Sequence, residues 1–298
     1  MRIRAMAIWA AMAFAPTAQA CINSVGTDHA GRRFHSDWYV GEEMAASMAK
    51  QYKRDNLLSS ASSTIDRART KPDFANLTNL GVLLIYQGQY AKAARLFLSI
   101  DRIFPGHHET AANLGTALEL MGQDQAALRW IRIGIVRNED EHLRSEWLHA
   151  RILEAKIALA NDPGFLSARS VAGIRFDRVV VPGLPPELPA GNDGMPVKPW
   201  ELNQALSYQL FERTQFVVPK DAVVANLLQD WATLNLAGGP IENADALYKL
   251  AVAYGASEDT LMKQRRAFIQ RTLAAAKKKE PQGLQCAICE PQGTPEDD

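Results

Sequence analysis

Two cysteines near the C-terminal end form the sharpest chemical motif of the chain, Cys286-Ala287-Ile288-Cys289. Thiols at this spacing form a redox couple at the start of a helix that follows a strand, and a zinc site when a second pair supplies two more ligands. Here the pair lies in a polar stretch, and the chain has one further cysteine, Cys21. We predict a local disulfide or an unreactive pair at Cys286 and Cys289, with a redox accessory as the alternative.

Histidines and acidic residues are the other candidates for chemistry. His107, His108 and Glu109 adjoin one another, but adjacent side chains diverge, and Glu109 also suits the first turn of a helix. A further set near the N-terminus has spacings that match no helical ligand pair: Asp28, His29, His35 and Asp37. The sequence contains no glycine-rich phosphate loop, nucleophile elbow or zincin motif. We therefore predict no metal, no cofactor and no enzymatic activity.

The N-terminus has the order of features that is typical of a bacterial secretory signal peptide. Arg2 and Arg4 precede an apolar stretch, and the small residues Ala18 and Ala20 mark a cleavage site. We expect residues 1–20 to be removed and the mature chain to be periplasmic. Cys21 would then be the first residue, and the alternative is that it carries the lipid of a membrane-anchored lipoprotein.

Composition narrows the classes of partner. The 298 residues include 33 Lys and Arg against 33 Asp and Glu, so the formal net charge is zero. Because the sequence shows no basic strip with interleaved aromatic residues, we predict no nucleic-acid partner. Beyond the N-terminus no apolar run is long enough to span a bilayer, so we expect membrane contact only if Cys21 is lipidated.

The elements that must position these residues follow a repeat of thirty-four residues. The triplet Asn79–Gly81 recurs as Asn113–Gly115. Residues of similar size recur at the same offset in further pairs, namely Leu84 with Leu118, Gly88 with Gly122, Ala93 with Ala127 and Phe97 with Ile131. A fixed period of this length indicates stacked pairs of antiparallel helices. Glycine in the triplets would let two helix backbones approach closely, and the later glycine would end the first helix of each pair.

The pattern resembles the tetratricopeptide repeat family over two consecutive units, 74–107 and 108–141. Signature positions are matched in the first unit by Leu77, Leu80, Gly81, Leu84, Ala93, Phe97 and Pro105, and in the second by Ala111, Leu114, Gly115, Leu118, Ala127, Ile131 and Gly134. The resemblance implies an all-α fold, built as a right-handed superhelical array of helical hairpins. It also implies an interaction scaffold, without pointing to a particular activity.

The N-terminal half is interpreted around these two units. Residues 21–40 are polar and are predicted to be irregular, whereas 41–161 should be helical repeats. Helices over 42–54 and 57–69 should form a hairpin that packs on the first clear unit. A helix from 142 to 160 should open a third unit.

The C-terminal half departs from the repeat. A Pro/Gly-rich insertion, 162–198, should interrupt the third unit and contain a short strand or extended segment at 174–181. Helical repeats should resume over 199–277, with a degraded unit at 225–258 and an amphipathic capping helix after it. Residues 278–298 are predicted to be a disordered tail.

In tetratricopeptide repeats, fixed positions of each first helix line a concave groove, so the resemblance assigns partner-binding positions. The residues chosen from these positions are Val82, Ile85, Tyr86, Glu109, Thr116, Glu119, Leu120, Glu146, Leu153 and Glu154. They combine an apolar floor with acidic groups and include no lysine or arginine, which predicts an apolar peptide segment with basic flanks. The predicted function is an exported scaffold that binds a protein or peptide partner, with envelope assembly as one setting. The alternative is a lipoprotein subunit of a membrane-associated complex.

Overall fold

The computed structural model describes residues 24–36, 38–49, 52–283 and 286–291. The predicted signal peptide and Cys21 lie outside the described residues. The described chain is mostly helical, and none of its described helices is long and apolar enough to cross a membrane. In chain order the elements are β1 (Ser24–Thr27), β2 (Arg33–Ser36), α1 (Glu42–Ala49), α2 (Tyr52–Ser59), α3 (Ala61–Thr70), α4 (Phe74–Tyr86), α5 (Tyr90–Ile103), α6 (His108–Leu120), α7 (Asp124–Arg137), α8 (Glu141–Arg144), α9 (Glu146–Asn161), α10 (Pro199–Arg213), α11 (Ala222–Gly238), α12 (Ile241–Tyr254) and α13 (Thr260–Ala276).

Helices α4 to α7 confirm a helical repeat. The bounds of α6 and α7 are those of α4 and α5 shifted by thirty-four residues. A Cβ added to Gly81 would lie 2.4 Å from Phe97, and one added to Gly115 would lie 2.5 Å from Ile131. Glycine at these positions therefore permits the close helix crossings. The glycine that follows each first helix has a left-handed φ of 73° in both repeats.

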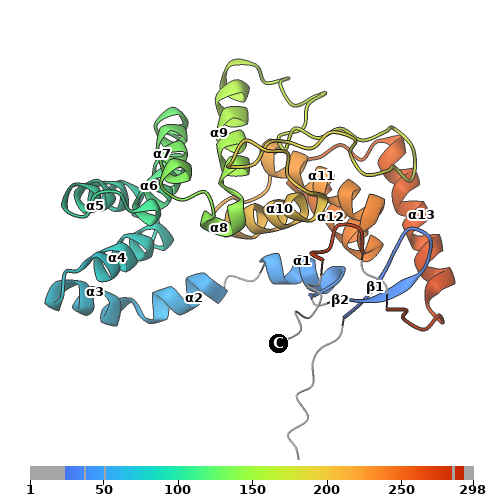
Figure 1. The fold of residues 1–298 in the computed structure, drawn as a ribbon, viewed down its shortest axis with the longest axis horizontal. Coiled ribbons are helices and arrows are strands. Elements are labelled where there is room, and N and C mark those ends of the chain that lie inside the picture. The colour runs from blue at the N-terminus through green and yellow to red at the C-terminus, as the bar shows by residue number, and fades with distance from the viewer. Residues whose placement is uncertain (1–23, 37, 50–51, 284–285, 292–298) are drawn as a thin grey trace, which may run out of the picture.

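Buried apolar side chains form two clusters that meet at α9. The first cluster joins α4 to α7 and includes Phe97, Leu114 and, from α9, Leu153. The second is built around α11, which is buried along most of its length, and takes Leu148 and Ile152 from α9. In Figure 1 the repeats stand on one side of α9, and α10 to α13 stand on the other. Helix α9 thus joins the repeats to the C-terminal half through both of its faces.

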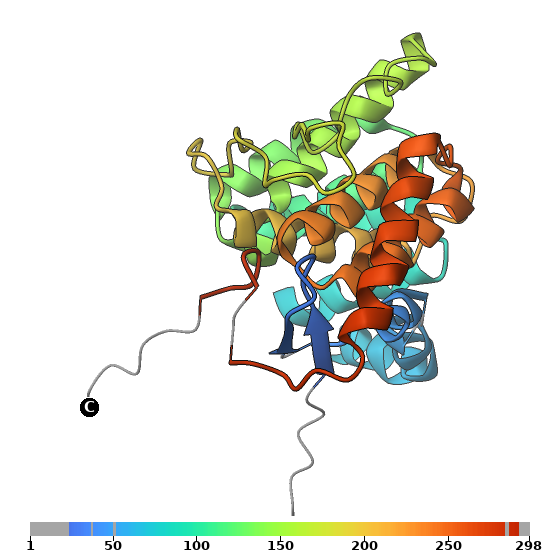
Figure 2. The ribbon, with the colours of Figure 1, turned by 90° about the vertical axis from the view of Figure 1, so that its right-hand side faces the viewer.

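The N-terminal segment contains a β-hairpin where the sequence predicts irregular chain. Strands β1 and β2 pair antiparallel, with Gly26 opposite Phe34. The Phe34 side chain is buried in the second cluster. The hairpin is also held from the other end of the chain, because the Gln282 amide donates to the Arg33 carbonyl at 2.7 Å. Figure 2 shows the hairpin beside one end of α13, with the chain after α13 passing close to it.

The helices before the first repeat differ in number and in place from the prediction. Three helices, α1 to α3, cover the region in which two were expected. Helices α2 and α3 contact α4, as expected, but α1 packs against α12. The reason is burial: Met44 and Met48 of α1 are both 1% exposed and belong to the second apolar cluster.

The helix that was predicted to open a third unit begins later than the periodicity predicts. Helix α9 starts at Glu146, because His142, Leu143 and Arg144 adopt left-handed φ values of 52°, 57° and 59°. Leu143 is 53% exposed, so the apolar pattern that extends a helix back to residue 142 does not report burial there. Non-glycine residues in this conformation cost about 1–3 kcal/mol each, and such strain is concentrated at functional sites.

Residues 162–198 contain no helix, and of the two forms predicted for 174–181, a short strand or an extended segment, the structure excludes the strand. Residues 174–181 lie near α13, where the buried Arg265 donates to the carbonyls of Asp177 and Val179 at 3.2 and 3.1 Å. Because a side chain satisfies these carbonyls, the segment is held without a partner strand. Earlier in the insertion, the Ser170 hydroxyl donates to Asp230 of α11 at 2.6 Å.

The C-terminal cysteines form a disulfide, as predicted for Cys286 and Cys289. The chain around them is packed on α11 and is not the disordered tail that the composition predicts. The Ala287 amide donates to the Gly238 carbonyl at 2.8 Å, and Ile288 is 1% exposed. Apolar Ile288 thus anchors a segment whose other residues are polar or small.

Candidate binding site

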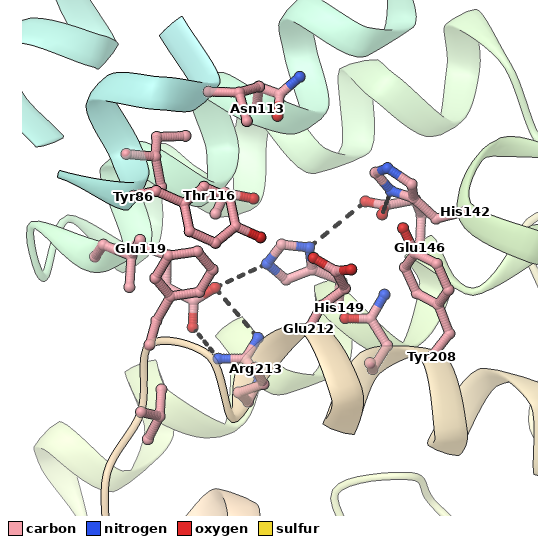
Figure 3. A pocket seen from close by; sticks show the side chains of 16 residues that line it. Tyr86, Asn113, Thr116, Glu119, His142, Glu146, His149, Tyr208, Glu212 and Arg213 are labelled. Atoms are coloured by element: carbon pink, nitrogen blue, oxygen red, sulfur yellow. Dashed lines mark hydrogen bonds and ion pairs between the residues drawn. The ribbon is translucent and has the colours of Figure 1, made fainter. Parts of the chain in front are cut away.

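A cavity of about 260 Å³ lies where the two clear repeats meet α9 and α10 (Figure 3). Helices α4 and α6 form one wall, and α10 with the turn after it forms the other. The lining residues are Val82, Ile85, Tyr86, Asn113, Thr116, Glu119, Leu120, His142, Glu146, His149, Tyr208, Gln209, Glu212, Arg213, Phe216 and Val217. Apolar side chains from both walls therefore surround a group of acids and bases.

Acids and bases alternate along one edge of the cavity. His142 Nδ1 lies 2.6 Å from Glu146 Oε1, and Glu146 Oε2 lies 3.6 Å from His149 Nδ1. On its other side His149 Nε2 lies 2.8 Å from Glu119 Oε2. Arg213 stands at the end of this row of side chains and donates to the two carboxylate oxygens of Glu119 at 2.5 and 3.3 Å. Figure 3 shows this row of interacting side chains, with His142 at one end and Arg213 at the other.

The pKa values of these groups follow from their pairing. Burial opposes the charged form of His149, but the hydrogen bond that it donates to Glu119 and the neighbouring Glu146 carboxylate outweigh burial and raise its pKa to about 9. Burial likewise opposes ionisation of Glu146, yet the two imidazoles lower its pKa to about 2. For Glu119, the Arg213 charge and the His149 hydrogen bond overcome burial and hold the pKa well below its usual range. At neutral pH Glu119 and Glu146 are therefore ionised and His149 is protonated, so charges of opposite sign alternate through these three side chains.

Stability should fall with rising pH because of His149. Its folded pKa of about 9 exceeds its unfolded value of about 6.5, so its contribution is complete below about pH 6.5 and is lost as the pH rises through about 9. As the pH rises from about 6.5 to about 8.5, we expect the stabilising contribution of His149 to decrease by about 2 kcal/mol. In urea unfolding, the loss of stability over this pH range should be smaller in a His149→Gln variant than in the wild type, by about 2 kcal/mol; the raised pKa of His142 leaves the variant a pH dependence of its own.

The control is His35→Gln, at an exposed position of β2. That variant should keep the pH dependence of the wild type. A His149→Gln protein that lost as much stability over this pH range as the wild type would contradict the charged state of His149.

The left-handed turn before α9 places His142 at the cavity, and the insertion holds that turn. Arg144 bridges Asp140 and Asp193 at 2.7 and 2.8 Å. Asn192 accepts from the Trp147 amide at 2.7 Å, so a residue of the insertion caps the first turn of α9. On the cavity side the Tyr208 ring stacks on His142, with ring centroids 5.2 Å apart. These contacts give the insertion a role in positioning one of the cavity's charged groups.

The structure brings most of the predicted groove residues together. Seven of the ten line the cavity, namely Val82, Ile85, Tyr86, Thr116, Glu119, Leu120 and Glu146. Leu153 is fully buried in the first cluster and offers no surface to a partner. Glu154 is exposed and pairs with Arg132 at 2.8 Å, and Glu109 lies near His107 and His108 at the start of α6. Neither of these two acids lines the cavity.

Most of the lining residues that were not predicted come from the other wall and from the strained turn, and His149 of α9 and Asn113 of α6 complete the set. His142, Tyr208 and Arg213 were outside the assigned groove positions, and Arg213 contradicts the expectation of a groove without arginine or lysine. One local signal was present, because Glu146 and His149 are three residues apart and so share a helix face. No local signal connects Arg213 to Glu119, which is 94 residues away in the chain.

Comparisons with known proteins leave this site to be interpreted from its own geometry. A scan against protein-family models finds no match, and a search of curated proteins finds no significant similarity. Within the part of the chain that the structure describes, no three His, Cys, Asp or Glu side chains are gathered as ligands for one metal ion. The cavity has the features of a binding site: apolar walls, a few convergent polar groups and perturbed pKa values.

Proposed function

We propose that this protein is an exported helical-repeat scaffold that binds a protein or peptide partner through the cavity between α4, α6, α9 and α10. The observation that carries the proposal is the repeat register of the lining. Residues of α4 and α6 that are thirty-four positions apart enter the same cavity in three pairs: Val82 with Thr116, Ile85 with Glu119, and Tyr86 with Leu120. Stacked repeats that present equivalent positions to one surface are how helical arrays build extended binding faces.

The proposal extends to the type of array and to its compartment. The tetratricopeptide resemblance supports a right-handed superhelix in which α4 and α6 belong to the concave face. The signal-peptide pattern supports export to a periplasm, where envelope assembly is one setting for such a scaffold. Neither Glu119 nor Glu146 supports a preference for basic flanks, because cations of the same chain already bind both carboxylates.

A bulky side chain that fills the cavity should abolish binding of the partner. Thr116→Trp adds an indole to the α6 wall, and the added volume should exclude a partner segment while the outer faces stay unchanged. The measurement is capture from the envelope of the native host, with bound proteins compared between the wild type and the variant. We expect at least one protein that the wild type retains to be lost, with a decrease of about tenfold or more for a loss of about 1.4 kcal/mol.

The matched control is Ser99→Trp, which places the same side chain at an exposed position of α5. This variant should retain the same protein as the wild type. If Thr116→Trp is folded and captures every partner at wild-type levels, the cavity is not the contact surface and the proposal fails.

A further inference from the structure

We propose that the cavity receives an uncharged apolar side chain of the partner together with an adjacent backbone carbonyl, which accepts a hydrogen bond from the Tyr86 hydroxyl. This inference rests on the proposed function, since it names the chemistry of the group that enters the cavity. Three observations carry it: a buried hydroxyl without a partner, an apolar lining, and acids and bases that already neutralise one another.

The hydroxyl of Tyr86 is the first observation. Tyr86 is 4% exposed, and its Oη has no hydrogen-bond partner in the structure. In Figure 3 the hydroxyl points toward the centre of the cavity. A buried polar group without a partner is costly, so such groups are usually satisfied by something the structure does not contain. Burial and the Glu212 charge raise the Tyr86 pKa, so the hydroxyl keeps its proton and is a donor.

The lining determines what lies next to that hydrogen bond. Val82, Ile85 and Leu120 come from the repeats, and Phe216 and Val217 close the opposite side. The Tyr86 and Phe216 rings are 4.9 Å apart between centroids and form an aromatic corner. An apolar cavity of roughly 150 Å³ can hold a benzene molecule. The volume of about 260 Å³ is therefore sufficient for an aromatic or branched aliphatic side chain.

The balance of charges determines that the group is neutral. Three carboxylates line the cavity, those of Glu119, Glu146 and Glu212, together with three bases. The bases, His142, His149 and Arg213, all pair with Glu119 or Glu146. A ligand charge would have to be desolvated beside Glu119 and Glu146, whose charges the three bases already match, which is unfavourable. A peptide carbonyl carries no net charge and is the acceptor that every partner segment provides.

The preference for a neutral group is tested with three probes that share the phenylalanine side chain and differ in net charge. They are N-acetyl-phenylalaninamide, which is neutral, N-acetyl-phenylalanine, which carries a carboxylate, and phenylalaninamide, which carries an ammonium group at about pH 6. Binding to the full-length mature protein is followed by NMR of the methyl groups of Val82, Leu120 and Val217. N-acetyl-leucinamide serves as a second neutral probe. We expect a neutral probe to bind about tenfold more tightly than either charged probe.

The role of Tyr86 is tested by Tyr86→Phe, which keeps the ring and removes the hydroxyl. The variant should bind the neutral probe about two- to tenfold more weakly, the usual range for one hydrogen bond. Its melting temperature without probe should stay the same or rise, because a buried hydroxyl without a partner is removed. Tyr90→Phe, a half-buried tyrosine outside the cavity, should leave probe affinity unchanged.

The outcomes separate this inference from the proposed function. Tighter binding of a charged probe, binding of neither neutral probe, or full affinity in Tyr86→Phe would overturn the inference. The proposed function would survive any of these results if Thr116→Trp still abolished capture of the partner. Conversely, probe binding without any effect of Thr116→Trp on capture would leave a neutral-group site that the partner does not use.

Discussion

Replacing Glu119 with glutamine should lower the free energy of unfolding by about 3–5 kcal/mol, the range observed when one member of a buried ion pair is removed. The Glu119 carboxylate is 5% exposed and binds three cations, Arg213, His149 and Lys156. An amide retains the shape but removes the negative charge, which leaves these cations close together without compensation. For a chain of this size the melting temperature should fall by on the order of 10 °C.

The control for this prediction is Glu154→Gln. Both acids were assigned to the groove from the repeat register, but Glu154 is about half-exposed and forms one surface ion pair with Arg132. Exposed pairs of this kind contribute about 0–1 kcal/mol, so thermal unfolding should hardly change. Equal destabilisation by the two substitutions would show that Glu119 does not have the buried, triply paired environment described above.

Gly115→Leu should destabilise the fold at the upper end of the range of about 1–3 kcal/mol that overpacking produces, or beyond it. A Cβ at this position would lie 2.5 Å from Ile131 Cδ1 and 3.4 Å from the Ile131 backbone nitrogen. The first contact forces the isoleucine to move, and the remaining leucine atoms extend further into the crossing of α6 and α7. Chemical denaturation should therefore show a lower midpoint.

Two further variants make this prediction specific. Gly183→Leu is the matched control, because a Cβ there would meet no atom within 4 Å, and its stability should be close to that of the wild type. Gly115→Ala combined with Ile131→Ala removes the clashing Cδ1 and Cγ1 atoms. The double variant should therefore be more stable than the sum of the single changes by about 0.5–3 kcal/mol. Strict additivity would argue that α6 and α7 do not cross at this pair.

The sequence by itself determined the features that depend on neighbouring residues along the chain. The thirty-four-residue register of the two repeats, the glycines at their crossings and the Pro/Gly-rich interruption at 162–198 all follow from periodicity, side-chain size and turn propensity. The same register predicted that Tyr86 and Leu120 lie on one face, which the structure places in one cavity. These predictions succeed because each repeat packs mainly on its neighbour, so local spacing specifies the contacts.

Outside the two repeats, the apolar periodicity predicted a helix start and a packing partner that the structure does not have. An apolar pattern extends the helix of the third unit back to residue 142, but the chain turns left-handed at His142, Leu143 and Arg144. Asn192 and Asp193 stabilise this turn from a segment almost fifty residues further on. In the same way α1 has a helical pattern that would fit the first repeat, yet it buries its methionines against distant helices. Apolar spacing predicts which face is buried and leaves open what buries it.

Only the tertiary structure decided the chemistry of the cavity. From the sequence, Glu119 and Glu146 were surface acids that would attract a basic partner. In the fold, α10 returns after the insertion and brings Arg213 to Glu119, while the left-handed turn brings His142 to Glu146. Whether a carboxylate attracts a ligand or is already neutralised depends on the charges within a few ångströms and on its exposure to water. Neither quantity is encoded in the spacing of residues along one helix, because both arise from segments that meet only when the chain has folded.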